Sequence, residues 1–286
     1  MDGTDSDQFE LTAGVPQGSV VGPTLFSIYY ADVPEDGDTE INVFADDTGV
    51  IASSVSLRLA FRYVQQHLNE LSKYYTRWKI KVNASKTEAI LFTRRRVPEQ
   101  LPELSYDGSR IMVGQEIKYL GLRLSRRLNL SSHVTHVIEN ARAARKRMWK
   151  FVSPRYDLPV GNRLTVFILF LRSILTCNAA VWSFLCLSDQ RKLESFQNQT
   201  LRLILGLRPD PTDHIQITNE ALLEGVGLPR VHDFVLHLST KLWNRLSEHE
   251  NPLIRFLTNI SHDPHALQRQ RSPFCILEGL LYSTSR

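Results

Sequence analysis

The chain has 286 residues, of which 42% are hydrophobic and 22% charged, and its formal net charge is +4. This composition excludes a disordered protein, and the length suits one large domain or two ordinary ones. Three cysteines without a C-x-x-C pair exclude a disulfide-rich scaffold and a zinc ribbon. The most apolar run, residues 164–175, is too short to span a bilayer and contains Arg172, so we expect no membrane partner.

The small net charge hides a strong asymmetry along the chain. Residues 1–57 hold eleven acidic residues and no lysine or arginine, whereas residues 58–155 hold 21 basic and seven acidic residues. The acidic block indicates metal ligands or a solvated acidic face, and the basic block indicates a polyanionic partner. From charge alone, two differently charged solvated surfaces are an equally good interpretation.

The first 125 residues predict a mixture of strands and helices. Residues 9–12 read as a strand, and Pro23 suits the first position of a short helix that continues to Asp32. Two β-rich runs on either side of Ala45-Asp46-Asp47-Thr48 predict a hairpin over residues 41–52. An apolar stripe at steps of three and four predicts a helix over residues 57–78. Further strands are expected at residues 80–82, 89–93, 104–106, 110–113 and 119–124, with a turn at Asp107-Gly108.

After residue 125 the pattern becomes helical. Ser131 is expected to cap a helix that has one apolar face and one basic face. Further helices are expected at residues 160–176, 189–205, 213–224 and 230–248, and the tail after Asn251 is expected to be loosely structured. The predicted fold class is therefore α+β, with an α+β unit followed by an all-helical unit. We place the boundaries at residues 1–125, 126–208 and 209–286.

Three short motifs, in order along the chain, carry the chemistry. They are Gly14-Val15-Pro16-Gln17-Gly18-Ser19, Phe44-Ala45-Asp46-Asp47 and Asn83-Ala84-Ser85-Lys86-Thr87. Each alone is a weak signal. An Asp-Asp pair at a hairpin tip usually serves the turn, a glycine-rich loop is usually structural, and a single lysine after a turn is usually a surface charge.

Together, the motifs resemble the palm of reverse transcriptases, and they are most similar to those of the jockey-like group of non-LTR retrotransposons. The resemblance rests on residues 13–23, the Ala-Asp-Asp box, Trp78-Lys79-Ile80-Lys81-Val82-Asn83 with Lys86-Thr87, and Lys118-Tyr119-Leu120-Gly121. It covers residues 9–125 strongly. It extends weakly to residue 207, where Gln197-Asn198-Gln199 and Leu201-Arg202 resemble a helix of the family's thumb. Within the α+β class, the resemblance implies a partial polymerase palm, which consists of an antiparallel sheet with helices. An all-helical thumb and C-terminal region are expected to follow it.

The resemblance implies an RNA-directed DNA polymerase that uses RNA template, DNA primer and dNTPs. Nucleotidyl transfer of this kind uses two Mg²⁺ ions, with Mn²⁺ as an alternative, and both prefer hard oxygen ligands. By resemblance, Asp46 is the metal ligand and Asp47 its accessory carboxylate, while Lys86 lies near the triphosphate. The implied contacts to nucleotide and template are Pro16, Gln17, Gly18 and Ser19, where the glycine permits close approach.

The basic block suggests contacts to the phosphates of a template–primer duplex. The candidate residues are Arg94, Arg95, Arg96, Arg142, Arg145, Lys146 and Lys150. Such a hybrid is gripped by its shape and backbone rather than by its sequence. A solvated helix face is the alternative interpretation of the basic helix.

The family also places a third catalytic carboxylate and the fingers upstream of the glycine-rich loop. Asp2, Asp5 and Asp7 stand in a polar context that does not match that motif. We therefore expect a palm–thumb portion whose activity requires an upstream polymerase segment as a partner. The alternative is a non-enzymatic, nucleic-acid-binding remnant of a mobile element, and metal-dependent nucleotide addition discriminates between the two. The implied localisation is a cytoplasmic ribonucleoprotein that reaches the nucleus.

Overall fold

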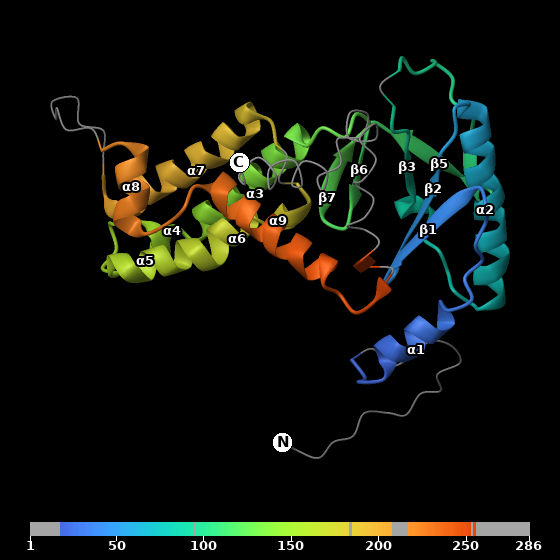
Figure 1. Cartoon of the computed structure of the whole chain (residues 1–286), viewed down its shortest axis with the longest axis horizontal. Helices are drawn as coiled ribbons and strands as arrows, with labels where there is room; N and C mark the ends of the chain where they lie inside the picture. Colours follow the sequence, from blue (N-terminus) through green and yellow to red (C-terminus); the bar gives the residue numbers. More distant parts are fainter. Residues whose placement is uncertain (1–17, 94, 183–184, 208–216, 253, 256–286) are drawn as a thin grey trace. The chain divides into compact units, whose positions relative to one another are not determined.

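The computed structural model describes residues 18–93, 95–182, 185–207, 217–252 and 254–255 (Figure 1). Two units meet along the chain between Leu120 and Gly121. The first mixes strands with helices and the second is mainly helical, so the α+β fold class is confirmed. The strand expected at residues 9–12 lies outside the described residues.

The acidic motif forms the tip of an antiparallel hairpin, as predicted. Strand β1 (Thr39–Phe44) pairs with β2 (Asp47–Ala52), and the last pair in the register is Phe44 with Asp47. Only two residues connect the strands. Ala45, the first of them, has a φ of 52°, the left-handed conformation on which two-residue hairpin loops depend.

Two helices accompany this hairpin in the first unit. Helix α1 (Gly22–Tyr29) has Pro23 in its first turn, as predicted, but ends three residues before Asp32. Helix α2 (Leu57–Arg77) confirms the apolar stripe and buries Phe61 and Leu71 against the strands.

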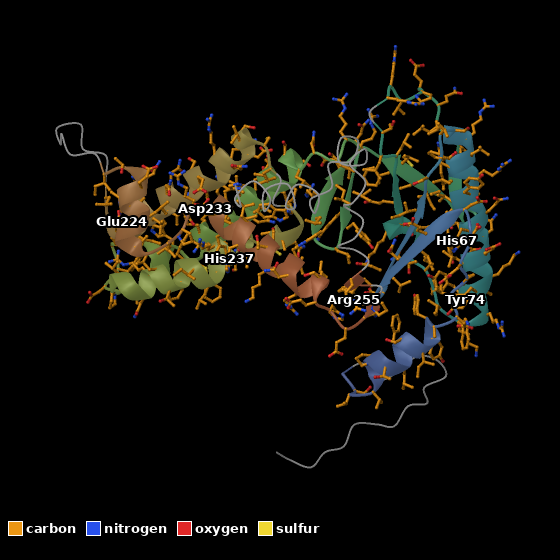
Figure 2. All side chains as sticks on the ribbon, in the orientation of Figure 1. His67, Tyr74, Glu224, Asp233, His237 and Arg255 are labelled. Atoms are coloured by element: carbon orange, nitrogen blue, oxygen red, sulfur yellow. The ribbon has the colours of Figure 1, made fainter. Side chains whose placement is uncertain are left out.

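A fully buried histidine anchors the start of the hairpin to α2. This residue, His67, lies on α2 (Figure 2). Its ring contacts the Thr39 hydroxyl on one side and lies 2.9 Å from the Pro34 carbonyl oxygen on the other. Its neighbours satisfy both ring nitrogens, so this histidine is structural.

A three-stranded sheet completes the core of the first unit. Its order is β3 (Glu88–Ile90), β5 (Ser109–Gly114), β4 (Leu104–Tyr106). The predicted turn joins β4 to β5, with left-handed backbone at Asp107 and Gly108. The expectation of an antiparallel sheet is wrong in one place, because β3 runs parallel to β5. Between them the chain reverses twice, through β4, and so returns in its original direction.

Two further strand predictions are wrong, and in both cases left-handed backbone intervenes. No strand forms at residues 80–82, because the chain turns at Lys79 (φ 55°) as α2 ends, although Ile80 still packs against the core. The strand expected at residues 119–124 is divided at Leu120 (φ 45°) and Gly121 (φ 82°). It becomes β6 (Glu116–Tyr119) in the first unit and β7 (Leu122–Ser125) in the second.

The second unit packs its helices around two hydrophobic clusters. Its elements after β7 are α3 (Ser131–Arg147), α4 (Trp149–Val152), α5 (Val160–Val166), η2 (Phe167–Arg172), α6 (Ser173–Leu175), η3 (Ala179–Val181), α7 (Leu187–Leu205), α8 (Asn219–Val226) and α9 (Val231–Ser247). The expected helices at 160–176, 189–205 and 230–248 are confirmed, and η2 is a π-helical stretch inside the first. The helix expected at 213–224 begins at Asn219, while residues 213–216 lie outside the described part. No described helix combines the length and apolarity that crossing a bilayer requires.

The predicted cap of α3 is wrong, because Ser131 serves a contact between helices. The helix has no side-chain cap, and the Ser131 hydroxyl donates a hydrogen bond of 2.5 Å to Asp189 at the start of α7. Asp189 is 2% exposed and also accepts from Lys192 (2.7 Å) and from the Cys186 thiol. Burial alone raises the pKa of a carboxyl group, but these donors together hold the pKa of Asp189 below its ordinary value.

The lowered pKa predicts a specific loss of stability in acid. A carboxylate whose pKa is lower in the folded than in the unfolded chain stabilises the fold above its unfolded pKa, and loses that contribution as the pH falls through the folded value. We expect Asp189→Asn to reduce the free energy of unfolding by about 1–3 kcal/mol at neutral pH, and by less as the pH falls below about 4. Urea unfolding across this pH range measures both, with Glu139→Gln on α3 as the control. A difference that stays constant with pH would contradict this role for Asp189.

Candidate active site

Two adjacent carboxylates stand exposed at the tip of the β1–β2 hairpin. Asp46 is the second loop residue and Asp47 begins β2, and both side chains are exposed to solvent. Exposure spares these charges the cost of desolvation. Mg²⁺ is commonly held by one or two carboxylates together with substrate phosphates, so this pair fits a magnesium site. Among the described residues, no group of three or more histidine, cysteine, aspartate or glutamate side chains gathers at the hairpin or at any other place, so the pair would rely on ligands from outside these residues.

Tyrosine hydroxyls lie beneath this acidic tip. The Thr48 hydroxyl is 3.2 Å from the Tyr75 hydroxyl, which connects β2 to α2. Burial and the neighbouring Tyr75 raise the pKa of Tyr30 to about 12, and the negative charge of Asp46 adds to the rise. The contribution of Asp46 to this rise places the Tyr30 hydroxyl near the carboxylate.

Aromatic packing fixes α1 against the same end of α2. Ring centroids lie 5.1 Å apart between Tyr29 and Trp78 and 6.2 Å apart between Tyr30 and Tyr75. The Tyr74 hydroxyl (Figure 2) donates to the Tyr29 carbonyl oxygen, which ends α1. These rings are occupied in packing, so they are poor candidates for stacking on bases.

The lysine-tyrosine-leucine-glycine motif also supports the hairpin. A Cβ added to Gly49 on β2 would lie 3.5 Å from the Tyr119 hydroxyl, so the ring of Tyr119 lies directly against this strand. Sequence reasoning identified this motif by resemblance alone, and it missed the roles of Thr48 and Tyr75. The only local signal for Tyr75 was its place in the apolar stripe of α2.

The described part of the glycine-rich loop shows an open backbone position. Gly18 has a φ of 87°, which favours glycine, and no atom of the described residues lies within 4 Å of a Cβ placed there. The Ser19 carbonyl oxygen accepts a hydrogen bond from the Gly22 amide as α1 begins. Pro16 and Gln17 lie outside the described residues.

Lys86 is exposed at the end of the short helix η1 (Ala84–Lys86). Asn83 holds this turn through its side chain, which accepts from Ser85 at 2.7 Å, and through its carbonyl, which accepts from Thr87 at 3.1 Å. Across the described part of the chain, no hydrogen bond or ion pair connects Lys86 with Asp46 or Asp47. Its proximity to a bound triphosphate therefore stays a prediction.

Most of the predicted basic residues in the described ranges are exposed, but one is not. The exposed members are Arg95, Arg96, Arg142, Lys146 and Lys150, the last on α4, while Arg94 lies outside the described residues. Arg145 differs, because it donates to the Thr200 hydroxyl at 2.9 Å and lies 4.9 Å from the Phe196 ring centroid. Burial lowers its pKa, and its charge is directed toward α7 rather than toward solvent.

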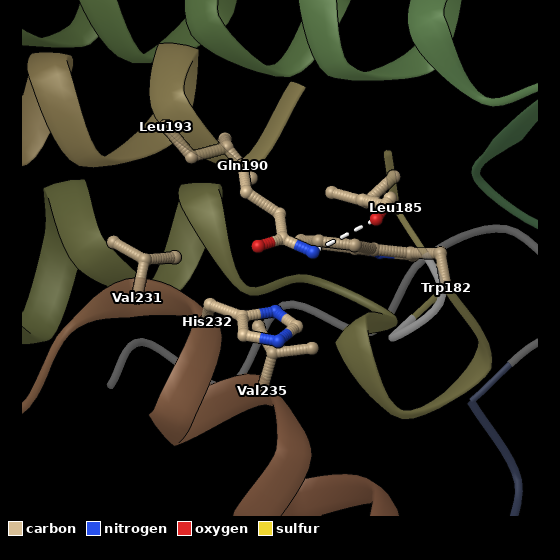
Figure 3. A pocket seen from close by; sticks show the side chains of 7 residues that line it. All are labelled: Trp182, Leu185, Gln190, Leu193, Val231, His232 and Val235. Carbon is tan, nitrogen blue, oxygen red and sulfur yellow. Dashed lines mark hydrogen bonds between the residues drawn. The ribbon is translucent and has the colours of Figure 1, made fainter. Parts of the chain in front are cut away.

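A small cavity in the second unit is too small for a substrate. Its volume is about 10 Å³, and Trp182, His232 and Val235 are among its lining residues (Figure 3). Gln190 crosses it to donate to the Leu185 carbonyl oxygen at 2.8 Å. This space holds one water molecule at most.

The hydroxyl contact beneath the hairpin predicts a local effect of Tyr75→Phe. This change keeps the ring but removes the bond to Thr48, so we expect the unfolding free energy to fall by about 0.5–1.5 kcal/mol. Amide exchange should accelerate most in β1 and β2. Urea unfolding and hydrogen-exchange mass spectrometry measure these effects, with Tyr63→Phe on α2 as the control. Equal exchange in both variants would show that Tyr75 does not hold the hairpin.

Comparison with known proteins shows that residues 1–124 match the family "Reverse transcriptase (RNA-dependent DNA polymerase)". The chain is 29% identical over 282 residues to the RNA-directed DNA polymerase from mobile element jockey of Drosophila melanogaster, covering 95% of this chain and 30% of that protein. It is 31% identical over 272 residues to the probable RNA-directed DNA polymerase from transposon X-element of the same species, covering 93% and 29%. No solved structure shows significant similarity to the chain.

The chain thus spans about 30% of the length of these relatives. The family match covers the acidic hairpin, α2 and the three-stranded sheet, and the relatives extend the similarity through the helical unit. Residues 1–124 thus match the reverse transcriptase family, and the chain is similar along most of its length to the RNA-directed DNA polymerases of the mobile element jockey and of transposon X-element.

Proposed function

We propose that the chain is part of an RNA-directed DNA polymerase that adds deoxynucleotides to a DNA primer on an RNA template. The observation that carries this proposal is the exposed pair Asp46 and Asp47 at a hairpin tip inside the reverse transcriptase match. The relatives, which are named as RNA-directed DNA polymerases, support this reading over a non-enzymatic remnant.

In the proposed mechanism, Asp46 and Asp47 hold two Mg²⁺ ions, or Mn²⁺ in their place. Ions held there would supply positive charge to the triphosphate and the Lewis acidity that favours ionisation of the primer hydroxyl. The hairpin directs both carboxylates outward, and Thr48 with Tyr75 limits its movement. Lys86 stabilises charge on the leaving pyrophosphate or donates a proton to it.

The glycine-rich loop and the basic residues are proposed to hold the nucleic acids. Open space at Gly18 lets the new base pair approach, with Pro16, Gln17 and Ser19 beside it. Phosphates of the hybrid contact the exposed basic residues Arg95, Arg96, Arg142, Lys146 and Lys150, together with Arg94. Arg145 contributes mainly by fixing α3 to α7.

We also propose a division of the chain into three regions. Residues 1–125 form the palm, residues 126–208 a thumb, and residues 209–286 a helical extension. The family's third carboxylate and its fingers belong to an upstream polymerase segment with which this chain acts. The place of action is a ribonucleoprotein that forms in the cytoplasm and reaches nuclear DNA.

Primer extension tests the catalytic proposal. The purified chain combined with an upstream polymerase segment, an RNA template, a DNA primer and dNTPs should give extension that requires Mg²⁺. Asp46→Asn should lower the rate by about a hundredfold or more, because it removes a charge on which transition-state stabilisation depends. Glu40→Gln, an exposed acid on β1, is the matched control and should leave the rate unchanged. A folded combination of the chain and the upstream segment that binds the hybrid without extending the primer would overturn the catalytic proposal.

The salt dependence of binding tests the basic surface. Each lost phosphate contact should reduce the slope of log affinity against log salt by about 0.7–0.9. We therefore expect smaller slopes for Arg142→Gln and Lys146→Gln, measured by fluorescence anisotropy with an RNA–DNA hybrid. Lys241→Gln on α9 removes an equally exposed charge and serves as the control. Equal slopes in all three variants would exclude α3 as the contact surface.

A further inference from the structure

A polar groove follows one face of helix α7. Its volume is about 260 Å³. Its lining residues recur at steps of three and four along α7 and include one residue at the start of α8: Arg191, Glu194, Ser195, Asn198, Gln199, Arg202 and Asn219. The proposed polymerase chemistry makes no use of this groove.

Two hydrogen-bond acceptors in its wall have no partner. Asn198 is only 6% exposed, and its Oδ1 is buried without a hydrogen bond. Glu194, one helical turn earlier, uses Oε1 to accept from the His232 backbone amide at 3.1 Å, but its Oε2 is also buried and unpaired. Residues four apart on a helix lie side by side, with about 5–6 Å between their Cβ atoms. The wall of the groove therefore contains two neighbouring acceptor side chains, each with one buried oxygen that lacks a donor.

Positive charge flanks these acceptors. Arg191 and Arg202 line the two ends of the groove, about 16 Å apart along the axis of α7. The Arg202 guanidinium also donates to the Ile217 carbonyl oxygen at 2.9 Å, which fixes its position. The complementary ligand carries N–H donors at its centre and negative charge on either side.

An unpaired nucleotide within a strand has this pattern. Its base offers amino and imino hydrogens on the Watson–Crick edge, and its neighbouring phosphates are anionic. Guanine fits best, because it places two donors side by side and an acceptor next to them, opposite the amides of Gln199 and Asn219. We propose that the α7 groove binds one unpaired base of a nucleic-acid strand, with guanine preferred, and holds the flanking phosphates with Arg191 and Arg202. This inference rests on the proposed function in one respect, namely that the ligand of the groove is a nucleic acid.

The test measures binding of the full chain without metal or dNTPs. Fluorescent uridine octamers carry guanosine, inosine, adenosine or cytidine at one central position, and a matched deoxy series distinguishes RNA from DNA. We expect the guanosine octamer to bind about tenfold more tightly than all-uridine, as two hydrogen bonds to buried acceptors imply. Inosine, which lacks the 2-amino group, should fall between them. Equal affinity for every octamer would overturn the proposal.

Two variants separate binding from folding. Asn198→Leu removes the unpaired oxygen and keeps a similar volume, so it should abolish the guanosine preference while leaving the unfolding midpoint in urea unchanged or higher. Asn244→Leu on α9, an exposed asparagine, is the matched control and should keep the preference. Glu194→Gln retains the Oε1 acceptor for α9 and should weaken guanosine binding alone, which gives a second variant if Asn198→Leu does not fold. A guanosine preference that survives both changes would contradict the site.

The outcome is independent of the polymerase proposal. Asp46→Asn should bind the octamers as the unchanged chain does, because it alters only the acidic hairpin. Primer extension without a guanosine preference would reject the groove and keep the polymerase. A guanosine preference in a chain that gives no extension even with the upstream segment present would keep the groove and reject the polymerase.

Discussion

The C-terminal end of α2 holds both α1 and the acidic hairpin in the first unit. Tyr75 contacts Thr48 on β2, and Tyr74 donates to the carbonyl oxygen that ends α1. Two carboxylate side chains at a hairpin tip make no packing contacts that would hold them in place. Exposure to solvent avoids the cost of desolvating them, but it also leaves the direction of the side chains unfixed. The direction of Asp46 and Asp47 must therefore come from the layer below, where the Thr48 and Tyr75 hydroxyls meet and the Tyr30 hydroxyl lies near Asp46.

Features set by neighbouring residues were the ones that the sequence allowed us to predict. The hairpin at Asp46, the turn at Asp107-Gly108 and the stripe of α2 all depend on residues within one or two turns of each other, and the structure confirms them. Leu120 shows the limit of such local reasoning. Leucine rarely adopts a positive φ, so the turn at Leu120-Gly121 gave no signal within an otherwise strand-like run.

Features that depend on distant partners were not predictable. Ser131 and Arg145 looked like a cap and an exposed charge, but their partners lie 58 and 55 residues away on α7. The same holds for the site. Asp46, Asp47 and Lys86 were identified by motif and resemblance, whereas Tyr75 supports the hairpin through a contact 27 residues away that no pattern in the sequence indicates.

A comparison of the two sides of α7 shows that the stability of the fold does not explain every polar residue on this helix. On one side, the half-buried Arg145 donates to Thr200 and lies over the Phe196 ring, so its charge has partners within the fold. On the other, Glu194 and Asn198 each keep a buried oxygen without a partner. A leucine in place of Asn198 would fill a similar volume without this penalty, because an unsatisfied buried acceptor costs about 1–3 kcal/mol. The amide thus weakens the fold of the isolated chain, and an N–H group that enters the groove is the simplest way to recover that free energy.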